Sequence, residues 1–327
     1  AGWAFPRWGL LALSFILIAT LISTQITSAQ EKTLRWKLQA GQTLGVRYGQ
    51  KITTEMMLHN RAVSTEADLQ MDTTWTVQRV APEAIADITH TIDRLTMTMN
   101  SPTGDPLVYD SAKPTAGNPV AEQLGRSVKP LLGIGFLEKM DARGQVLDMR
   151  LSPAGENAIR KTSANGQVKD MFSKEGMKQL VHQAVAVLPS DPIAPGARWR
   201  DQTQTSSPMG MLHTELEYHY VGSQQRDNRT VERIDVTMTL AFPEQGDPLG
   251  LNVEIKQQDN SGVLYFDATA GRFTESIIHQ KMVLEAAVGE RTHRQELGTT
   301  LHTQFSTRQE TVRPASQAAK NSAAALK

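Results

Sequence analysis

The strongest constraint on the fold is a long alternation of apolar and polar residues with a period of two. Charged side chains such as Arg47 and Lys51 fall between the members of one largely apolar row. That row contains Leu44, Val46, Tyr48, Gln50, Ile52, Thr54, Met56 and Leu58. A β-strand sends successive side chains to opposite faces, so this pattern predicts a strand with one dry face.

Two further alternating segments follow over residues 69–77 and 88–99, separated by a turn at Pro82. In the second of them the apolar parity shifts after Ile92, which predicts a β-bulge near Arg94. Consecutive strands joined by short turns are typical of an antiparallel meander. Alternation returns between residues 212 and 305, after the proline-rich connector Leu188–Trp199. The two ends of the chain are therefore predicted to be β-rich.

The middle of the chain has helical patterns instead. Asn118 followed by Pro119 is typical of a helix start, as is Ser152 followed by Pro153. Ser173 is a good cap for a third helix, whose apolar residues keep helical spacing as far as Leu188. Two similar hairpins, each with an Asp opening the turn and a Gly closing it, are predicted within residues 136–151 and 263–278.

Together these patterns predict an α+β fold that is mainly β. We expect a curved antiparallel sheet, like a half-barrel, covered by a few helices. Residues 30–313 are predicted to form a single β-rich domain. The two hairpins also suggest a duplicated plan, with halves 30–151 and 195–313 around a helical middle, 118–190. Residues 314–327 are mostly Ala, Ser, Gln and Lys, which predicts a disordered tail.

The first residues have the layout of a secretory signal peptide, predicted over residues 1–29. Arg7 precedes an apolar run from Leu10 to Ile22, and small residues end at Ala29. The run is short for a membrane-spanning helix, although an uncleaved anchor is the alternative. The chain is therefore expected to be exported, to the periplasm, the cell envelope or the extracellular space. Without cysteine, it has neither disulfides nor a lipid-modified N-terminal cysteine.

Composition and missing motifs exclude several functions. The sequence has 34 basic and 34 acidic residues, whereas nucleic-acid binders usually carry a basic excess. It contains no GxSxG, P-loop, GxGxxG or HExxH motif. We therefore predict no enzyme activity, no cofactor and no metal. A hydrolase that uses carboxylates or histidine remains an alternative.

Three groups of residues could still carry chemistry. The row His213, Glu215, Glu217 and His219 could hold a metal, but a solvated outer strand face is the favoured interpretation. His90 shares a row with Ile88 and Ile92, which predicts an inward core histidine with no partner in the nearby sequence. The pairs Met97–Met99 and Met209–Met211 could bind copper, although adaptable packing is favoured.

Several segments carry a resemblance to known proteins. The stretches LRWKLQAGQTLGVRY, LPSDPIAPGARWR and GVLYFDATAGRFTES resemble a family of exported bacterial proteins of unknown function. The FDxxxGRFxxS hairpin also resembles elements of lipoprotein carriers of the LolA type. That resemblance implies a curved antiparallel sheet that holds an acyl chain against covering helices. It carries over no binding residue one for one.

The favoured function is therefore a non-enzymatic binding protein of the cell envelope, holding a lipid or other apolar ligand between sheet and helices. The alternative is a structural or protein-interaction module of the envelope with no small ligand. Membrane contact is expected only through the signal segment, if it is uncleaved. The residues expected to face an apolar ligand are Tyr48, Met71, Trp75, Met97, Met99, Leu216, Tyr218 and Met238.

Overall fold

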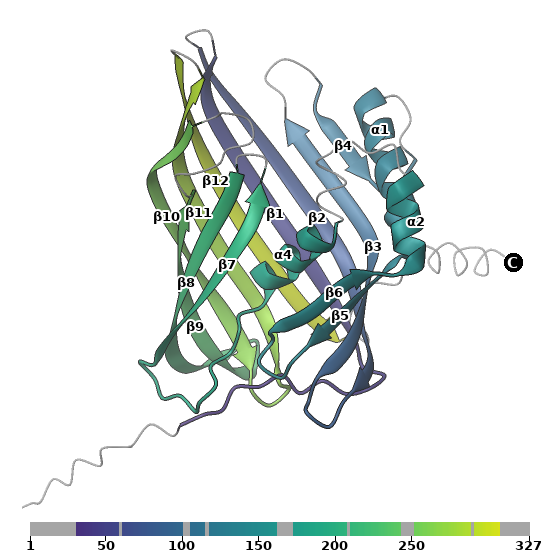
Figure 1. The fold of residues 1–327 in the computed structure, drawn as a ribbon, viewed down its shortest axis with the longest axis vertical. Coiled ribbons are helices and arrows are strands. Elements are labelled where there is room, and N and C mark those ends of the chain that lie inside the picture. Colours follow the sequence, from purple (N-terminus) through teal and green to yellow (C-terminus); the bar gives the residue numbers. More distant parts are fainter. Residues whose placement is uncertain are drawn as a thin grey trace, which may run out of the picture. The chain divides into compact units, whose positions relative to one another are not determined.

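The alternating segments form twelve strands among the described residues, and all of them join one antiparallel sheet (Figure 1). They are β1 (Thr43–Leu58), β2 (Arg61–Val80), β3 (Ala86–Asn100), β4 (Leu107–Asp110), β5 (Gly135–Met140), β6 (Val146–Leu151), β7 (Arg198–Ser207), β8 (Gly210–Arg226), β9 (Arg229–Ala241), β10 (Asn252–Asp267), β11 (Arg272–Val288) and β12 (Arg291–Thr307). The predicted fold class, mainly β with one curved, unclosed antiparallel sheet, is confirmed.

The structure is a computed structural model that describes residues 31–58, 61–100, 105–114, 118–161, 173–207, 210–242, 252–288 and 291–307. The predicted signal peptide (1–29), the predicted tail (314–327) and Met209 of the second methionine pair lie outside these ranges. None of the helices in the described part of the chain is both long and apolar enough to cross a membrane.

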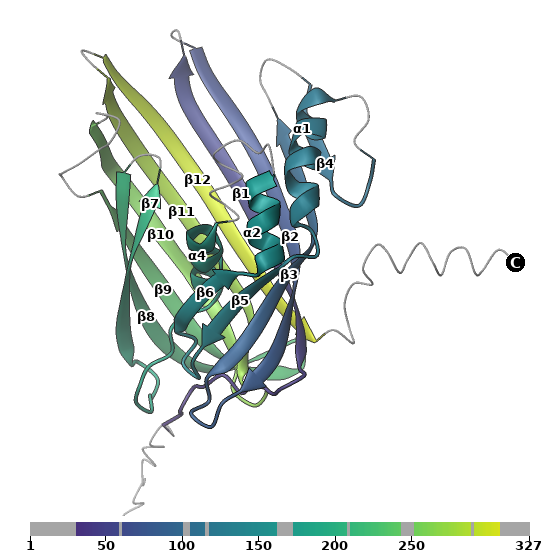
Figure 2. The same cartoon turned by 45° about the vertical axis from the view of Figure 1, so that its right-hand side comes forward.

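The strand order is β6-β5-β3-β2-β1-β12-β11-β10-β9-β8-β7, with β4 beside β3. The first strand thus pairs with the last, as Val46 opposite Phe305 shows. The two edge strands, β6 and β7, come from the middle of the sequence. Viewed from two directions, the sheet curves around a trough, in which one helix lies between these edges (Figures 1 and 2).

The three predicted helices form at the predicted starts. They are α1 (Pro119–Val128), α2 (Pro153–Lys161) and α4 (Lys174–Ala184). The Asn118 side chain accepts hydrogen bonds from two backbone amides of α1, and the Ser173 hydroxyl accepts one from Gly176. Helix α4 ends at Ala184, not at Leu188 as the apolar spacing predicts. The reason is that the chain turns extended at Val185, and Leu188 donates a backbone hydrogen bond to Arg143.

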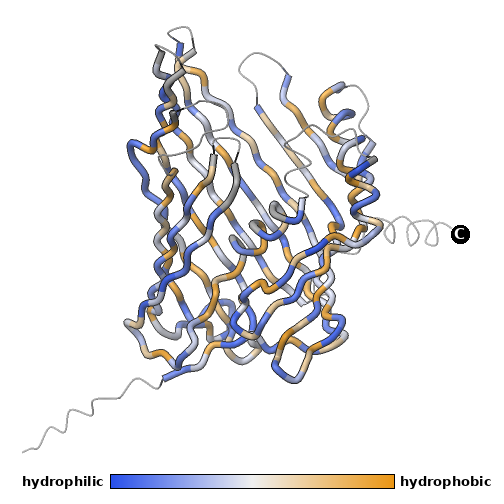
Figure 3. Tube along the Cα trace, in the orientation of Figure 1, coloured by the Kyte–Doolittle hydropathy of each residue, from blue (hydrophilic) through white to orange (hydrophobic). Residues whose placement is uncertain are grey.

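The predicted alternation is visible along the strands as successive orange and blue segments (Figure 3). We call the face that carries Leu44, Val46 and Tyr48 the inner face; all three are buried. The predicted bulge is confirmed, because Asp72 pairs with Arg94 and Thr73 with Ile92. The inner row of β1 is not buried along its whole length, because Met56 is 37% exposed.

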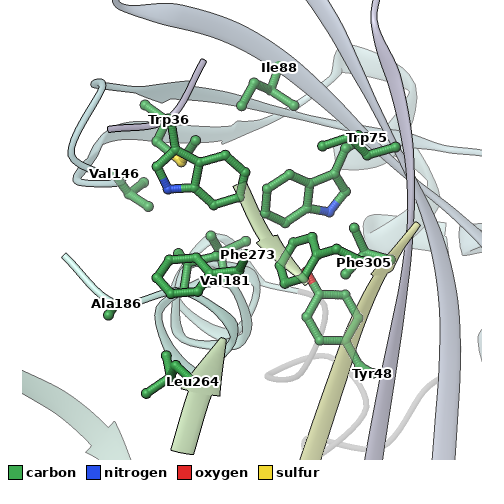
Figure 4. Close-up of a cluster of buried hydrophobic side chains, with 14 of the residues drawn as sticks. Trp36, Tyr48, Trp75, Ile88, Val146, Val181, Ala186, Leu264, Phe273 and Phe305 are labelled. Carbon is green, nitrogen blue, oxygen red and sulfur yellow. The ribbon is translucent and has the colours of Figure 1, made fainter. Parts of the chain in front are cut away.

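One end of the trough is filled by what we call the aromatic base, the side chains of Trp36, Trp75, Phe266, Phe273 and Phe305 (Figure 4 shows four of these among its labelled residues). The ring centroids of Trp36 and Trp75 are 6.2 Å apart, and those of Trp75 and Phe305 are 5.5 Å apart. Because offset and edge-to-face ring contacts at such distances are favourable, this end is a packed core rather than a pocket.

The segment before β1 that carries Trp36 is fixed at this base by backbone hydrogen bonds to two hairpin turns. Trp36 donates its backbone N–H to Ala142 in the β5–β6 turn, and Lys37 donates to Gly271 in the β10–β11 turn. These are the two similar hairpins predicted from sequence. Gly271 has φ +64°, and a Cβ there would lie 2.7 Å from the backbone nitrogen of Lys37. Only glycine therefore allows the chain to pass so closely.

Candidate functional site

A cavity of about 570 Å³ lies between α4 and the inner face of β7 to β11. Small-molecule sites typically enclose ~300–1,000 Å³ between mostly apolar walls, so the size is suitable for a ligand. The apolar lining consists of Val185, Ala186, Leu212, Leu216, Tyr218, Val236, Met238, Leu240, Leu264, Ile278 and Met282. The cavity is therefore a largely apolar chamber within the trough.

The register of the sheet sets this wall. Leu216 of β8 lies opposite Met238 of β9, and Tyr218 lies opposite Val236. Because side chains alternate along a strand, these cross-strand pairs all face the same side. Leu264 of β10 and Ile278 of β11 continue the surface toward the centre of the sheet. The opposite wall is Val185 and Ala186, in the extended chain that follows α4.

Polar groups occur along the borders of the chamber. Lys174, Lys178 and His182 lie on α4, and Gln202, Thr203 and Gln204 lie on the edge strand β7. Thr214 and Gln280 complete the polar lining. The side-chain amide of Gln280 donates to the sulfur of Met238 at 3.1 Å. The chamber thus combines an apolar wall with a few polar groups, which is the usual chemistry of a binding site.

Burial shifts the pKa of two groups in the chamber, His182 and Tyr218, in the direction that favours the neutral form. Burial lowers the pKa of His182, an effect that Asp201, 3.9 Å from the ring, opposes. Burial also raises the pKa of the Tyr218 phenol, and the nearby Asp201 carboxylate adds to this shift. Desolvation disfavours the charged form of each group. The positive charge lining the chamber therefore comes from the two lysines of α4.

The eight residues expected to face a ligand fall into separate places. Leu216, Tyr218 and Met238 line the chamber together. Tyr48, Met71 and Trp75 are buried in the core, and Trp75 is part of the aromatic base. Met97 and Met99 are half-buried on β3, and neither is among the residues that line the chamber. The structure therefore brings together the members from β8 and β9 and keeps the members from β1 to β3 apart from them.

His90 is a buried core histidine, but the expectation that it has no partner nearby is wrong. Its Nε2 lies within hydrogen-bonding distance of the Glu138 carboxylate, which is equally buried. Its ring also meets Trp75 edge-on, with centroids 4.5 Å apart. Glu138 comes from β5, which pairs with β3, so only the sheet pairing brings it near. The sequence does indicate that this carboxylate points inward, because Glu138 lies in the same period-two row as the apolar Phe136 and Met140.

The His213–His219 row lies on the outer face of β8, and the intervening Leu216 and Tyr218 are buried on the inner face. Glu217 forms ion pairs of 2.7 Å with Arg198 and with Arg200 of the neighbouring strand, on the face away from the chamber. In the part of the chain that the structure describes, no group of three or more His, Asp or Glu residues could hold a metal ion.

A second hollow, of about 550 Å³, lies over β1 and β10 to β12 and is lined mainly by polar side chains such as Lys51 and Glu296. It lacks the apolar wall of the chamber.

Comparison with known proteins adds the following. Residues 83–231 match the model of a family of unknown function, DUF6263. The predicted resemblance to a family of unknown function is thus confirmed over this segment. No curated protein matches the sequence.

The solved structures that match this chain include the following three. Lipovitellin, studied for its lipid–protein interactions, has a TM-score of 0.42 and 11% identity over 85% of this chain, which spans 26% of the lipovitellin chain. A Bacteroides fragilis protein with a YmcC-like fold, assigned to the exported proteins, has a TM-score of 0.28 and 9% identity over 83% of this chain and 98% of its own. A domain from Vibrio parahaemolyticus assigned to outer-membrane lipoprotein sorting has a TM-score of 0.13 and 7% identity over 82% of this chain and 87% of its own. At these scores the similarities identify no ligand for this chain.

Proposed function

We propose that this chain is an exported, non-enzymatic binding protein of the cell envelope that holds a lipid or another apolar ligand between its sheet and α4. The observation that carries the proposal is the chamber of about 570 Å³ with its continuous apolar wall from β8 to β11. A ligand that covered this wall would gain about 25 cal/mol for each Å² of apolar surface removed from water.

The wall is built from residues that adapt to different ligand shapes. Met238 and Met282 both line the chamber, and both are half-buried. Methionine is unbranched and polarizable, so it is common at surfaces that accept varied apolar partners. The expected export of the chain is in keeping with a carrier or receptor of lipids outside the cytoplasm.

The chemistry around the chamber favours binding over catalysis. Burial lowers the pKa of His182, the histidine of the lining, and its described partner is the carboxylate of Asp201. A hydrolase would need a nucleophile within hydrogen-bonding reach of such a base. Among the described residues, no hydrogen bond joins His182 to Thr203, Thr214 or Tyr218, the lining residues that carry a hydroxyl.

Filling the chamber tests the proposal. Met238→Trp places an indole in the apolar wall, so we expect it to weaken binding of the neutral dye N-phenyl-1-naphthylamine by about tenfold or more, equivalent to ~1.4 kcal/mol. Thr237→Trp is the matched control, because Thr237 is exposed and points to the other face of the same strand. Native mass spectrometry of protein purified from its own host should also show a bound lipid.

Two results would contradict the proposal. The first is protein that neither carries a lipid nor binds the dye. The second is equal dye binding by Met238→Trp and the original chain. Either result would favour the alternative, an envelope module that contacts other proteins, and crosslinking in the native envelope would then identify the partner.

A further inference from the structure

One face of α4 carries three basic side chains along the chamber. Lys174, Lys178 and His182 are spaced four residues apart, and all three belong to the chamber lining. Residues four apart lie on the same side of a helix, about 6 Å apart along its axis. The two lysines therefore present neighbouring ammonium groups at one border of an otherwise apolar space.

The charged side chains in the described lining of the chamber are basic. Lys174 has one carboxylate partner, Asp148 of β6, at the long distance of 4.0 Å. For Lys178, no described side chain forms an ion pair. Asp201 of β7 lies beside His182, two helical turns from Lys174. Among the described residues that line the chamber, the charged side chains toward the start of α4 are Lys174 and Lys178.

Such an arrangement stabilises the empty protein little. Exposed lysines contribute little to folding when they lack a close partner, and their main effect is on the potential that a ligand meets. At the border of an apolar chamber, that potential favours a molecule whose tail is apolar and whose polar end is negative. Charge complementarity of this kind mainly sets which ligand is chosen.

We infer that the ligand of the chamber is an amphiphile with an anionic headgroup, a carboxylate or a phosphate, which Lys174 and Lys178 bind while its tail lies along the wall from β8 to β11. The inference rests on the proposed function, because it specifies the ligand class of the same site. Neighbouring ammonium groups about 6 Å apart suit the separated oxygens of either headgroup.

A competition series tests the headgroup separately from the tail. Decanoate, decyl phosphate, decanol and decyltrimethylammonium share one chain length and differ in charge, and each would displace bound N-phenyl-1-naphthylamine. We expect the two anions to bind about tenfold more tightly than decanol, and the cation to bind most weakly. The order of decanoate and decyl phosphate identifies the headgroup, and either order supports the inference.

The double variant Lys174→Gln/Lys178→Gln should lower the preference of decanoate over decanol to about twofold. Lys139→Gln/Lys281→Gln removes the same charge from exposed strand positions outside the chamber lining and should keep the full preference. The inference is overturned if decanoate and decanol compete equally, or if the α4 variant keeps the preference. Failure of the original chain to bind the dye at all would instead refute the proposed function. Circular dichroism of both variants verifies that they are folded.

Discussion

The aromatic base and the chamber are built from the same inner face, yet one is filled and the other is hollow. At the base, Trp36 and Trp75 bring rings to within 6.2 Å of each other and leave no space for a ligand. Over β8 to β11, Leu, Val and Met side chains border about 570 Å³. The difference shows that a dry strand face becomes a core or a site according to what covers it.

The covering elements explain this difference. The base is covered by the segment that carries Leu34 and Trp36, which the two hairpin turns hold by backbone hydrogen bonds. Among the described residues, the chamber is covered by α4, a helix of 11 residues, and by the extended chain that follows it. Helix α4 reaches Asp148 on one edge strand and Asp201 on the other. A single short helix cannot fill the width of the trough, so the apolar wall beneath it keeps a space.

The largest expected effect lies next to the base, where the ring of His90 contacts Trp75. His90→Leu leaves the Glu138 carboxylate buried without its partner, and breaking a buried pair in this way costs about 3–5 kcal/mol. Urea denaturation should show a correspondingly lower free energy of unfolding. Dye binding at the chamber should persist while the protein remains folded.

The double variant His90→Leu/Glu138→Met is the control for this prediction. Replacing both members of a buried pair by apolar residues of similar size is often neutral. We therefore expect it to recover most of the lost stability. If the single variant is as stable as the original chain, the pair does not support the base.

The second prediction compares one change in the two regions. Leu44 is 0% exposed in the core, and Leu216 is 7% exposed on the chamber wall. Leu44→Ala should cost ~2–5 kcal/mol, as buried truncations in packed cores do. Leu216→Ala should cost roughly 1–2 kcal/mol less than Leu44→Ala, because its chamber side has fewer neighbouring atoms to lose.

Urea denaturation of the two leucine variants under one set of conditions makes the comparison direct. Equal losses would mean that the chamber wall is packed as tightly as the base. Adding a saturating apolar ligand should raise the stability of the original chain and reduce the contrast, since a ligand that binds only the folded state stabilises it.

Local patterns predicted most of the elements. The strands, the bulge near Arg94, the helix starts at Pro119 and Pro153 and both Asp–Gly hairpins follow from spacing and turn chemistry. These features depend on neighbours in the sequence, where periodicity and capping act. A local pattern is therefore enough to place them.

Long-range pairing determined what the sequence did not predict. Trp75 and Met238 both occupy dry rows, but only Trp75 meets Trp36, which arrives from a separate segment. Glu138 reaches His90 through the pairing of β5 with β3, across 48 residues. A period-two pattern assigns a side chain to a face and carries no information about the element opposite it.

The smallest effect concerns pH and the chamber. Burial lowers the pKa of His182 below its ordinary value of 6.5, so below that pH the unfolded chain binds a proton that the folded chain resists. Stability should therefore fall as the pH drops from about 6.5 toward the lowered pKa. Urea denaturation over roughly pH 5 to 8 should show a smaller decline for His182→Gln, which cannot titrate there. Saturating decanoate should also reduce the decline, because a nearby anion favours the protonated ring. A His182→Gln profile that matches the original chain would show that the pKa of His182 is the same in the folded and the unfolded chain, so that burial in the chamber does not outweigh the attraction of Asp201.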